Sequence, residues 1–123
     1  MKNHYQTEEQ IAAVVAGFEQ CTTGKSEFTH LSHLTVAVCY LRSSTPDQAF
    51  QKMRDGLFRF IDHHGIDRAK YSEQLTRDWI ALVQGVLEQL DPNLSLLVVT
   101  NIVLDRLGDS RIAASDGKCA WRE

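Results

Sequence analysis

Two histidines three residues apart, His30 and His33, have the spacing in this chain that most clearly suggests chemistry. They lie in the run Phe28-Thr29-His30-Leu31-Ser32-His33, directly before an apolar segment. On a helix, residues three apart lie on the same side, with side chains a few ångströms apart. That spacing suits two imidazoles that bind one metal ion, as in helical bundles whose ligands project inward.

A carboxylate that could complete such a site lies further along the chain, at Glu73. If the helix that carries Glu73 faces the helix that begins near His30, the carboxylate meets both imidazoles. Two histidines and a carboxylate form the ligand set of non-haem iron sites and of catalytic zinc sites with open positions. The pattern therefore predicts a divalent metal ion, such as zinc, iron or manganese, bound by His30, His33 and Glu73.

Three further polar residues are expected around this site. Thr76 and Arg77 follow Glu73 at offsets of three and four, so they share its helix face, and Tyr71 precedes it by two residues. An arginine recognises carboxylates and phosphates through paired hydrogen bonds. Tyr71, Thr76 and Arg77 are therefore predicted to bind a small polar or anionic ligand, although these residues do not indicate a reaction.

Structural explanations of the same residues stay open beside the functional one. Two histidines early in a helix are commonly half-exposed or hydrogen-bonded to a carboxylate. Glu73 has a partner for an ordinary ion pair in Arg77, four residues later. The neighbouring pair His63-His64 comes at the expected end of a helix, where histidine interacts favourably with the helix terminus.

Apolar residues at helical spacing, together with the capping residues, prolines and glycines between these segments, predict five helices. Expected starts are a capping box at Thr7-Glu8-Glu9-Gln10, a cap at either Ser26 or Thr29, and a second capping box with proline at Thr45-Pro46-Asp47-Gln48. Gly65 is suited to the left-handed residue that comes after the third helix. The fourth helix is expected at about 69–90 and the fifth from Asp91-Pro92.

The connections between these segments are short, which favours antiparallel packing of neighbouring helices. We therefore expect an all-α fold: a single-domain bundle of about five helices over residues 1–123. Residues 1–6 and 109–123 lack sustained periodicity, so a less regular start and an irregular C-terminal tail are expected.

Composition argues against two classes of partner. The chain has 13 basic and 16 acidic residues and a formal charge of −3, without the basic stripe that binding to nucleic acid requires. It also lacks a run of roughly 18 apolar residues, so no membrane-spanning helix is expected. Three widely spaced cysteines and no signal peptide at the N-terminus are typical of a cytoplasmic protein with reduced thiols.

A non-catalytic function is the alternative to a ligand site. The expected second and fifth helices are apolar on nearly all sides, which is more apolar surface than we expect one small bundle to cover. A surplus apolar face commonly marks a protein interface. This pattern favours a protein–protein interaction module that acts as a homodimer.

Three motifs together resemble an uncharacterised family of small helical bacterial proteins. Its F-x-H-x-x-H-L motif corresponds to Phe28, His30, His33 and Leu34. An A-x-x-x-x-R-x-G-L-x-x-F motif matches Ala49, Arg54, Gly56, Leu57 and Phe60, and a Y-H-E-T-x-T-x-x-W motif matches Tyr71, Glu73, Thr76 and Trp79. The last motif departs at Ser72 and Gln74, where the family has histidine and threonine. The resemblance implies a helical domain with a shared polar pocket and implies no activity.

Overall fold

The computed structural model describes residues 4–24 and 27–107, and within these ranges the chain is helical with no strand. This confirms the predicted all-α bundle, while the predicted tail at 109–123 lies outside the described residues. The elements are α1 (Glu8–Glu19), α2 (His30–Ser43), α3 (Pro46–His63), the short 3-10 helix η1 (Arg68–Lys70), α4 (Glu73–Glu88) and α5 (Leu96–Leu107).

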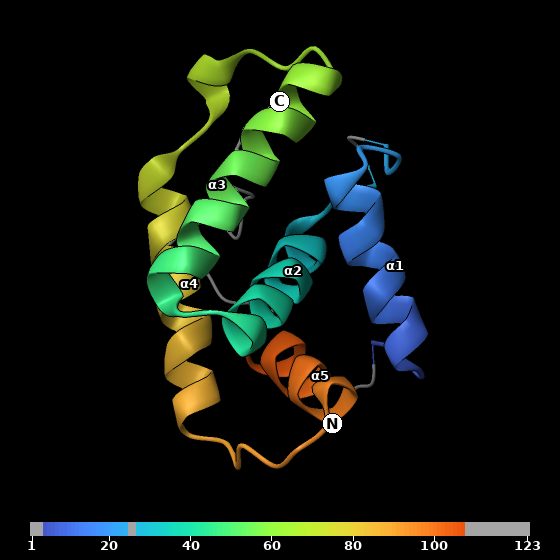
Figure 1. Cartoon of the computed structure of the whole chain (residues 1–123), viewed down its shortest axis with the longest axis vertical. Helices are drawn as coiled ribbons and strands as arrows, with labels where there is room; N and C mark the ends of the chain where they lie inside the picture. Colours follow the sequence, from blue (N-terminus) through green and yellow to red (C-terminus); the bar gives the residue numbers. More distant parts are fainter. Residues whose placement is uncertain (1–3, 25–26, 108–123) are drawn as a thin grey trace.

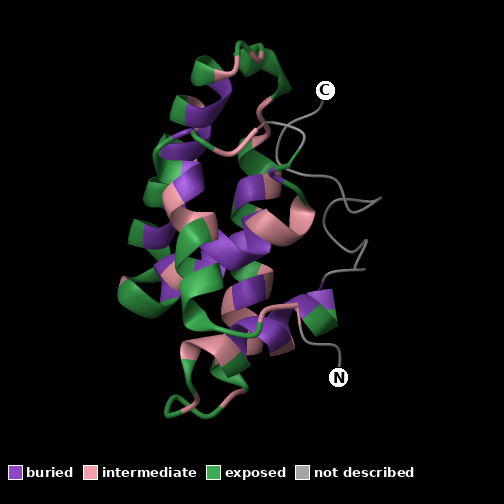
Figure 2. Ribbon diagram, turned by 90° about the vertical axis from the view of Figure 1, so that its right-hand side faces the viewer, coloured by how far each residue is buried: buried purple, intermediate pink, exposed green. Residues whose placement is uncertain are grey.

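Helix α2 is the central element, and the other four α-helices surround it (Figure 1). Its sequence explains this position, because residues from His33 to Leu41 are apolar or small on almost every side and nearly all of them are buried. Colouring by burial shows the buried residues facing the interior of the bundle (Figure 2). Helices α3 and α4 pack side by side and run in opposite directions.

The two predicted capping boxes are present. The backbone nitrogen of Gln10 donates to the Thr7 hydroxyl at 3.2 Å, and the backbone nitrogen of Thr7 donates to the side-chain oxygen of Gln10 at 3.2 Å. Thr45 and Gln48 make the same pair of bonds at the start of α3, also at 3.2 Å. These bonds satisfy backbone donors that a helix start otherwise leaves open, and each is worth about 1 kcal/mol.

The predicted starts of α4 and α5 were wrong by several residues. Helix α4 begins at Glu73 and not at Ala69, because Ser72 is the residue whose hydroxyl accepts the Leu75 amide, at 3.1 Å. Helix α5 begins at Leu96 and not at Pro92. The Asp91 carboxylate accepts a hydrogen bond from the backbone nitrogen of Asn93 at 2.9 Å, and this bond closes a turn instead of capping a helix.

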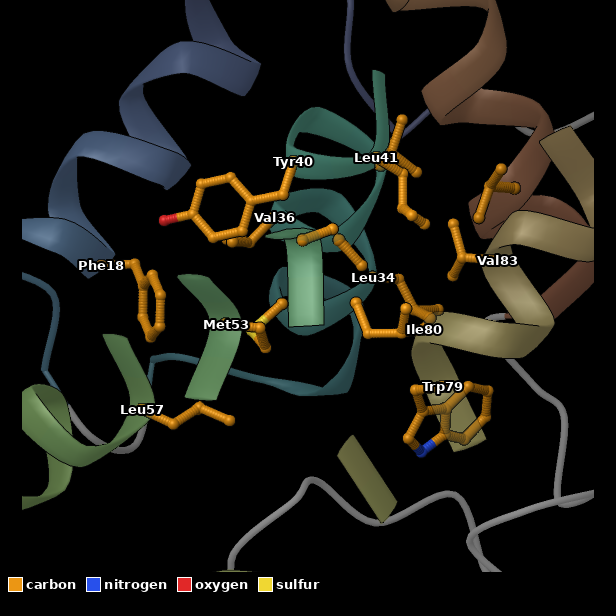
Figure 3. Close-up of a cluster of buried hydrophobic side chains, with 14 of the residues drawn as sticks. Phe18, Leu34, Val36, Tyr40, Leu41, Met53, Leu57, Trp79, Ile80 and Val83 are labelled. Carbon is orange, nitrogen blue, oxygen red and sulfur yellow. The ribbon is translucent and has the colours of Figure 1, made fainter. Parts of the chain in front are cut away.

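The core is one cluster of aliphatic and aromatic side chains from all five α-helices. Figure 3 shows its middle part, where Val36 and Leu34 of α2 lie between Phe18 of α1 and Ile80 of α4. Gly56 of α3 lies so close to Phe18 of α1 that there is no room for a larger residue. A Cβ atom on Gly56 would lie 2.5 Å from Cε2 of Phe18. The core therefore depends on the glycine of α3 as well as on its large residues.

The chain itself covers the apolar surface that suggested a homodimer. Helix α2 packs against α1, α3, α4 and α5, and among the described residues only Val98 is a large hydrophobic side chain with more than a third of its surface exposed, at 42%. The homodimer therefore stays a prediction, and it is no longer supported by a surplus of exposed apolar surface on the described residues. No helix in the described part of the chain has the length and apolar character needed to cross a membrane.

Candidate functional site

The first turns of α2 and α4 lie beside each other, as the predicted site required. His33 of α2 and Thr76 of α4 line the same cavity, together with Met53, Trp79 and Ile80. This cavity measures about 10 Å³, which is the size of a single water molecule and too small for an organic ligand. The meeting of α2 and α4 is thus a closely packed interior.

His33 is buried in this interior, with 6% of its surface exposed. Its ring packs edge-on against Phe28, with 4.7 Å between the ring centroids. Burial among apolar groups disfavours the charged imidazolium and lowers the pKa of His33 from 6.5 to about 3. His33 is therefore neutral at physiological pH, and it contributes to packing.

His30 is the first residue of α2 and is half-buried. Its ring packs edge-on against the indole of Trp79, with 4.6 Å between the ring centroids. Its Nε2 atom lies 3.4 Å from the carbonyl oxygen of Leu107, a distance at which a hydrogen bond is weak. His30 thus joins the start of α2 to α4 and to the end of α5.

Glu73 does not join the two imidazoles. Its side chain is 51% exposed, and its carboxylate lies 3.7 Å from the guanidinium of Arg77 on the same helix, which confirms the simpler ion-pair explanation. No three His, Cys, Asp or Glu side chains in residues 4–24 and 27–107 are grouped as metal ligands would be. His30, His33 and Glu73 therefore do not form a ligand set in this arrangement, and metal binding remains a prediction.

The arginine of the predicted ligand site lies between α3 and α4. The Cζ atom of Arg77 is 4.2 Å from the ring centroid of Phe50 on α3, and the Cζ atom of Arg54 is 5.7 Å from the same centroid. A cation over an aromatic face is attracted to the π-electrons of the ring. Phe50 therefore interacts with two guanidinium groups, one from α3 and one from α4.

Tyr71 belongs to the same surface. Its ring packs against Phe58 of α3, with 4.6 Å between the centroids. Burial raises the pKa of the Tyr71 hydroxyl, although the Thr76 hydroxyl and the charges of Arg54 and Arg77 act in the opposite direction. Arg54 and Arg77 are thus both within electrostatic range of this hydroxyl, whose oxygen atom is buried and which stays neutral at physiological pH.

A hollow of about 340 Å³ opens next to Arg77, between the start of α3 and the outer face of α4. Its volume is within the range of small-molecule sites. The wall on α3 includes Asp47 and Phe50, and the floor on α4 includes Ala81, Gly85 and Glu88. A second hollow, of about 310 Å³, adjoins it near the end of α4, since Gln84 and Glu88 line both.

The structure thus divides the predicted residues into two groups. His33 and Thr76 are buried between α2 and α4, whereas Arg77 lies with Tyr71 at the surface between α3 and α4. The sequence interpretation did not include Phe50, Arg54 or Asp47 in the site. The spacing of Phe50 and Arg54, four residues apart on α3, was a signal that could have found them.

Comparisons with known proteins identify no relative, because neither a family model, nor a curated protein, nor a solved structure matches this chain. The resemblance to the family of small helical bacterial proteins therefore remains a prediction. Function must consequently be inferred from the arrangement of the side chains themselves.

Proposed function

We propose that this protein binds a small ligand with an anionic group, and that Arg77 and Arg54 hold that group beside the hollow between α3 and α4. The observation that carries the proposal is the position of two guanidinium groups over one ring, at 4.2 and 5.7 Å from the centroid of Phe50. Phe50 is buried and lines the hollow together with Arg77, whereas Arg54 contacts the same ring from one helical turn further along α3 and does not line the hollow.

The guanidinium groups are suited to this role because their present partners are weak. Arg77 contacts Glu73 at 3.7 Å and Arg54 contacts Asp55 at 3.5 Å, each on its own helix. More than a third of each side chain in these pairs is exposed, and exposed ion pairs contribute only about 0 to 1 kcal/mol. A carboxylate or phosphate can replace these partners and accept paired hydrogen bonds from a guanidinium.

Aromatic stacking also fixes the two cations before a ligand arrives. A side chain that is already ordered loses less conformational entropy on binding, which improves affinity. The hydroxyl of Tyr71 is within electrostatic range of both arginines, but its oxygen atom is buried, so it does not contact a ligand at the surface. Of the predicted ligand residues, Arg77 is therefore part of this proposal, together with Arg54. Thr76 is buried between α2 and α4 and takes no part in it.

Titration with hexanoate and hexyl phosphate, followed by isothermal calorimetry and by amide chemical shifts, tests the proposal. We expect binding with shifts at Asp47, Ala81 and Gly85, which line the hollow. The double variant Arg54→Gln/Arg77→Gln is expected to lose at least about tenfold in affinity, which corresponds to about 1.4 kcal/mol.

Arg68→Gln is the matched control, because Arg68 also lies over an aromatic ring at 4.5 Å, but that ring belongs to Phe58, which does not line the hollow as Phe50 does. Circular dichroism of each variant verifies that it is folded. No binding of either compound by the wild-type chain, or equal affinity in the double variant, would contradict the proposal.

A further inference from the structure

The N-terminal part of the chain is joined to the other helices by a single connection, the segment between α1 and α2. Helix α1 lies at the edge of the bundle, where it contacts α2, α3 and α5 (Figure 1). The other helices also pack against one another, since α2 contacts α3, α4 and α5, and α4 contacts α3 and α5. Residues 4–19, which we name the N-terminal unit, can therefore separate from the bundle through a change in one connection.

Buried polar side chains hold the start of this unit on α5 and α2. Oδ1 of Asn101 accepts from the backbone nitrogens of His4 and Tyr5, at 2.8 and 3.0 Å, and its Nδ2 donates to the carbonyl oxygen of Tyr5 at 3.0 Å. The Tyr5 hydroxyl lies 2.9 Å from the hydroxyl of Thr35, and both Asn101 and Thr35 are buried. A buried amide is costly unless it is hydrogen-bonded, so these bonds favour one specific position of the unit.

Phe18 anchors the other end of the unit in the core. Its ring is fully buried, it lies against Gly56 of α3, and its centroid is 5.8 Å from that of Phe60. These two partners, like Asn101 and Thr35, belong to helices that follow the connection. A second copy of the chain therefore offers the N-terminal unit the same partners in the same arrangement.

The connection begins with a strained residue, Cys21, whose φ of 58° is in the left-handed region. The backbone nitrogen of Thr22 donates to the carbonyl oxygen of Gly17 at 2.9 Å, and this bond closes a Schellman ending of α1 around Cys21. Glycine is the usual residue at this position, because a Cβ atom makes the left-handed conformation costly. Within residues 4–24 and 27–107 no other non-glycine residue has a positive φ. The sharp turn after α1 is thus kept at a cost in energy.

We infer that a second copy of this chain is a partner, and that two copies exchange their N-terminal units, so that residues 4–19 of each copy pack on α2, α3 and α5 of the other. The contacts of the unit with Asn101, Thr35, Gly56 and Phe60 are all kept in such a dimer. Only the connection changes: it opens, and Cys21 can adopt a negative φ. Exchange of an identical element is a low-cost route to a dimer, and a strained connection favours it.

Two effects favour the closed monomer and set the concentration at which the dimer forms. Nε2 of His64 donates to the carbonyl oxygen of Thr23 at 2.9 Å, and this bond ties the closed connection to the end of α3. A unit on a short tether also has an effective concentration of about 1 mM for its own bundle. Because relief of strain at both connections acts against these effects, we expect the dimer at protein concentrations that approach this value. The hollow between α3 and α4 is formed by one copy in either state, so exchange and anion binding are independent.

Sedimentation equilibrium at concentrations up to about 1 mM, in the presence of a reductant and after refolding from urea, measures the dimer. The wild-type chain is expected to dimerise in this range. Cys21→Gly removes the strain of the closed turn and should weaken dimerisation at least about tenfold. Cys21→Ala is the matched control, because it also removes the thiol but leaves a Cβ atom in the left-handed conformation. Its dimerisation should equal that of the wild-type chain.

Exchange itself is detected in a dimer prepared from equal amounts of isotope-labelled and unlabelled chains. A filtered nuclear Overhauser spectrum, which shows only contacts between copies, should contain signals between the rings of Phe18 and Phe60. A wild-type chain that stays monomeric at about 1 mM would overturn the inference, and so would a dimer that lacks these signals. Equal dimerisation of Cys21→Gly and Cys21→Ala would show that strain at the connection does not drive the exchange, and would overturn it as well.

Discussion

The guanidinium of Arg77 lies over the ring of Phe50, with 4.2 Å between its Cζ atom and the ring centroid. This contact joins α4 to α3 at the edge of the hollow and links a buried residue to an exposed charge. The ring thereby restricts where the charge can lie. Stacking and ligand binding should consequently change together when the ring is removed.

Replacement of the ring is the first prediction. Phe50→Leu removes the aromatic face and keeps an apolar side chain, so it should weaken hexanoate binding several-fold and cost about 1 to 2 kcal/mol of stability. Calorimetry and urea denaturation measure the two effects. The matched variant Phe58→Leu removes the ring beneath Arg68 and should leave hexanoate binding unchanged. Equal affinities in wild type and Phe50→Leu would show that the stacked cation is not needed.

His33 should make the stability of the fold dependent on pH. Because burial lowers its pKa in the folded chain to about 3, the unfolded chain binds the extra proton between about pH 6.5 and pH 3. The free energy of unfolding is therefore highest above about pH 6.5 and falls as the pH decreases through this window, by at most about 1.4 kcal/mol per unit from this residue.

Urea denaturation between pH 5 and pH 7.5 measures this dependence. The His33→Leu variant should lose the part of the slope that His33 contributes, whereas His63→Gln, at an exposed position, should keep it. An identical slope in wild type and His33→Leu would mean that the imidazole is not buried in its neutral form.

Replacement by alanine should change the stability of the fold in opposite directions at two glycines on different helices. Gly56→Ala would place a Cβ atom 2.5 Å from Phe18, so we expect a loss of about 1 to 3 kcal/mol through overpacking. Gly85→Ala meets open space within α4 and should stabilise the chain by up to about 1 kcal/mol through helix propensity. Thermal unfolding of both variants gives the comparison, and a gain in stability for Gly56→Ala would disprove the close approach of α1 and α3.

Added metal ions should have little effect on the fold. The carboxylate of Glu73 pairs with Arg77, and the described residues hold no group of three His, Cys, Asp or Glu ligands, so zinc, iron or manganese at about 100 µM should not raise the unfolding temperature. Protein without an affinity tag is needed for the measurement. A rise of several degrees that disappears in His30→Gln/His33→Gln would restore the metal site that the sequence suggested.

Local signals made most of the helices predictable from the sequence. The hydroxyls of Thr7 and Thr45 each accept a hydrogen bond from the backbone nitrogen three residues later. Both capping boxes can therefore be predicted from a few neighbouring residues of the sequence. The start of α4 was harder, because Asp67 and Ser72 both accept a nearby backbone amide, and only Ser72 caps the longer helix. At Asp91 the same kind of side-chain bond closes a turn.

The site was less predictable because it depends on contacts between helices. The sequence predicted that His33 and Thr76 lie near each other, as they do between α2 and α4. It could not show that the cavity they line has a volume of only about 10 Å³. It also could not decide whether Glu73 turns to the imidazoles or to Arg77, since helical spacing does not fix the conformation of a long side chain. The pairing of Arg77 with Phe50 depends on how α3 and α4 pack, which residue spacing does not encode.

The most direct measurement of anion binding is the nuclear magnetic resonance signal of each arginine Nε–Hε group during titration with hexanoate. We predict that the signals of Arg77 and Arg54 shift together and saturate, whereas those of Arg68 and Arg106 stay in place. Shifts of equal size at every arginine, or no shift at Arg77, would contradict the claim that these two stacked guanidinium groups hold the ligand.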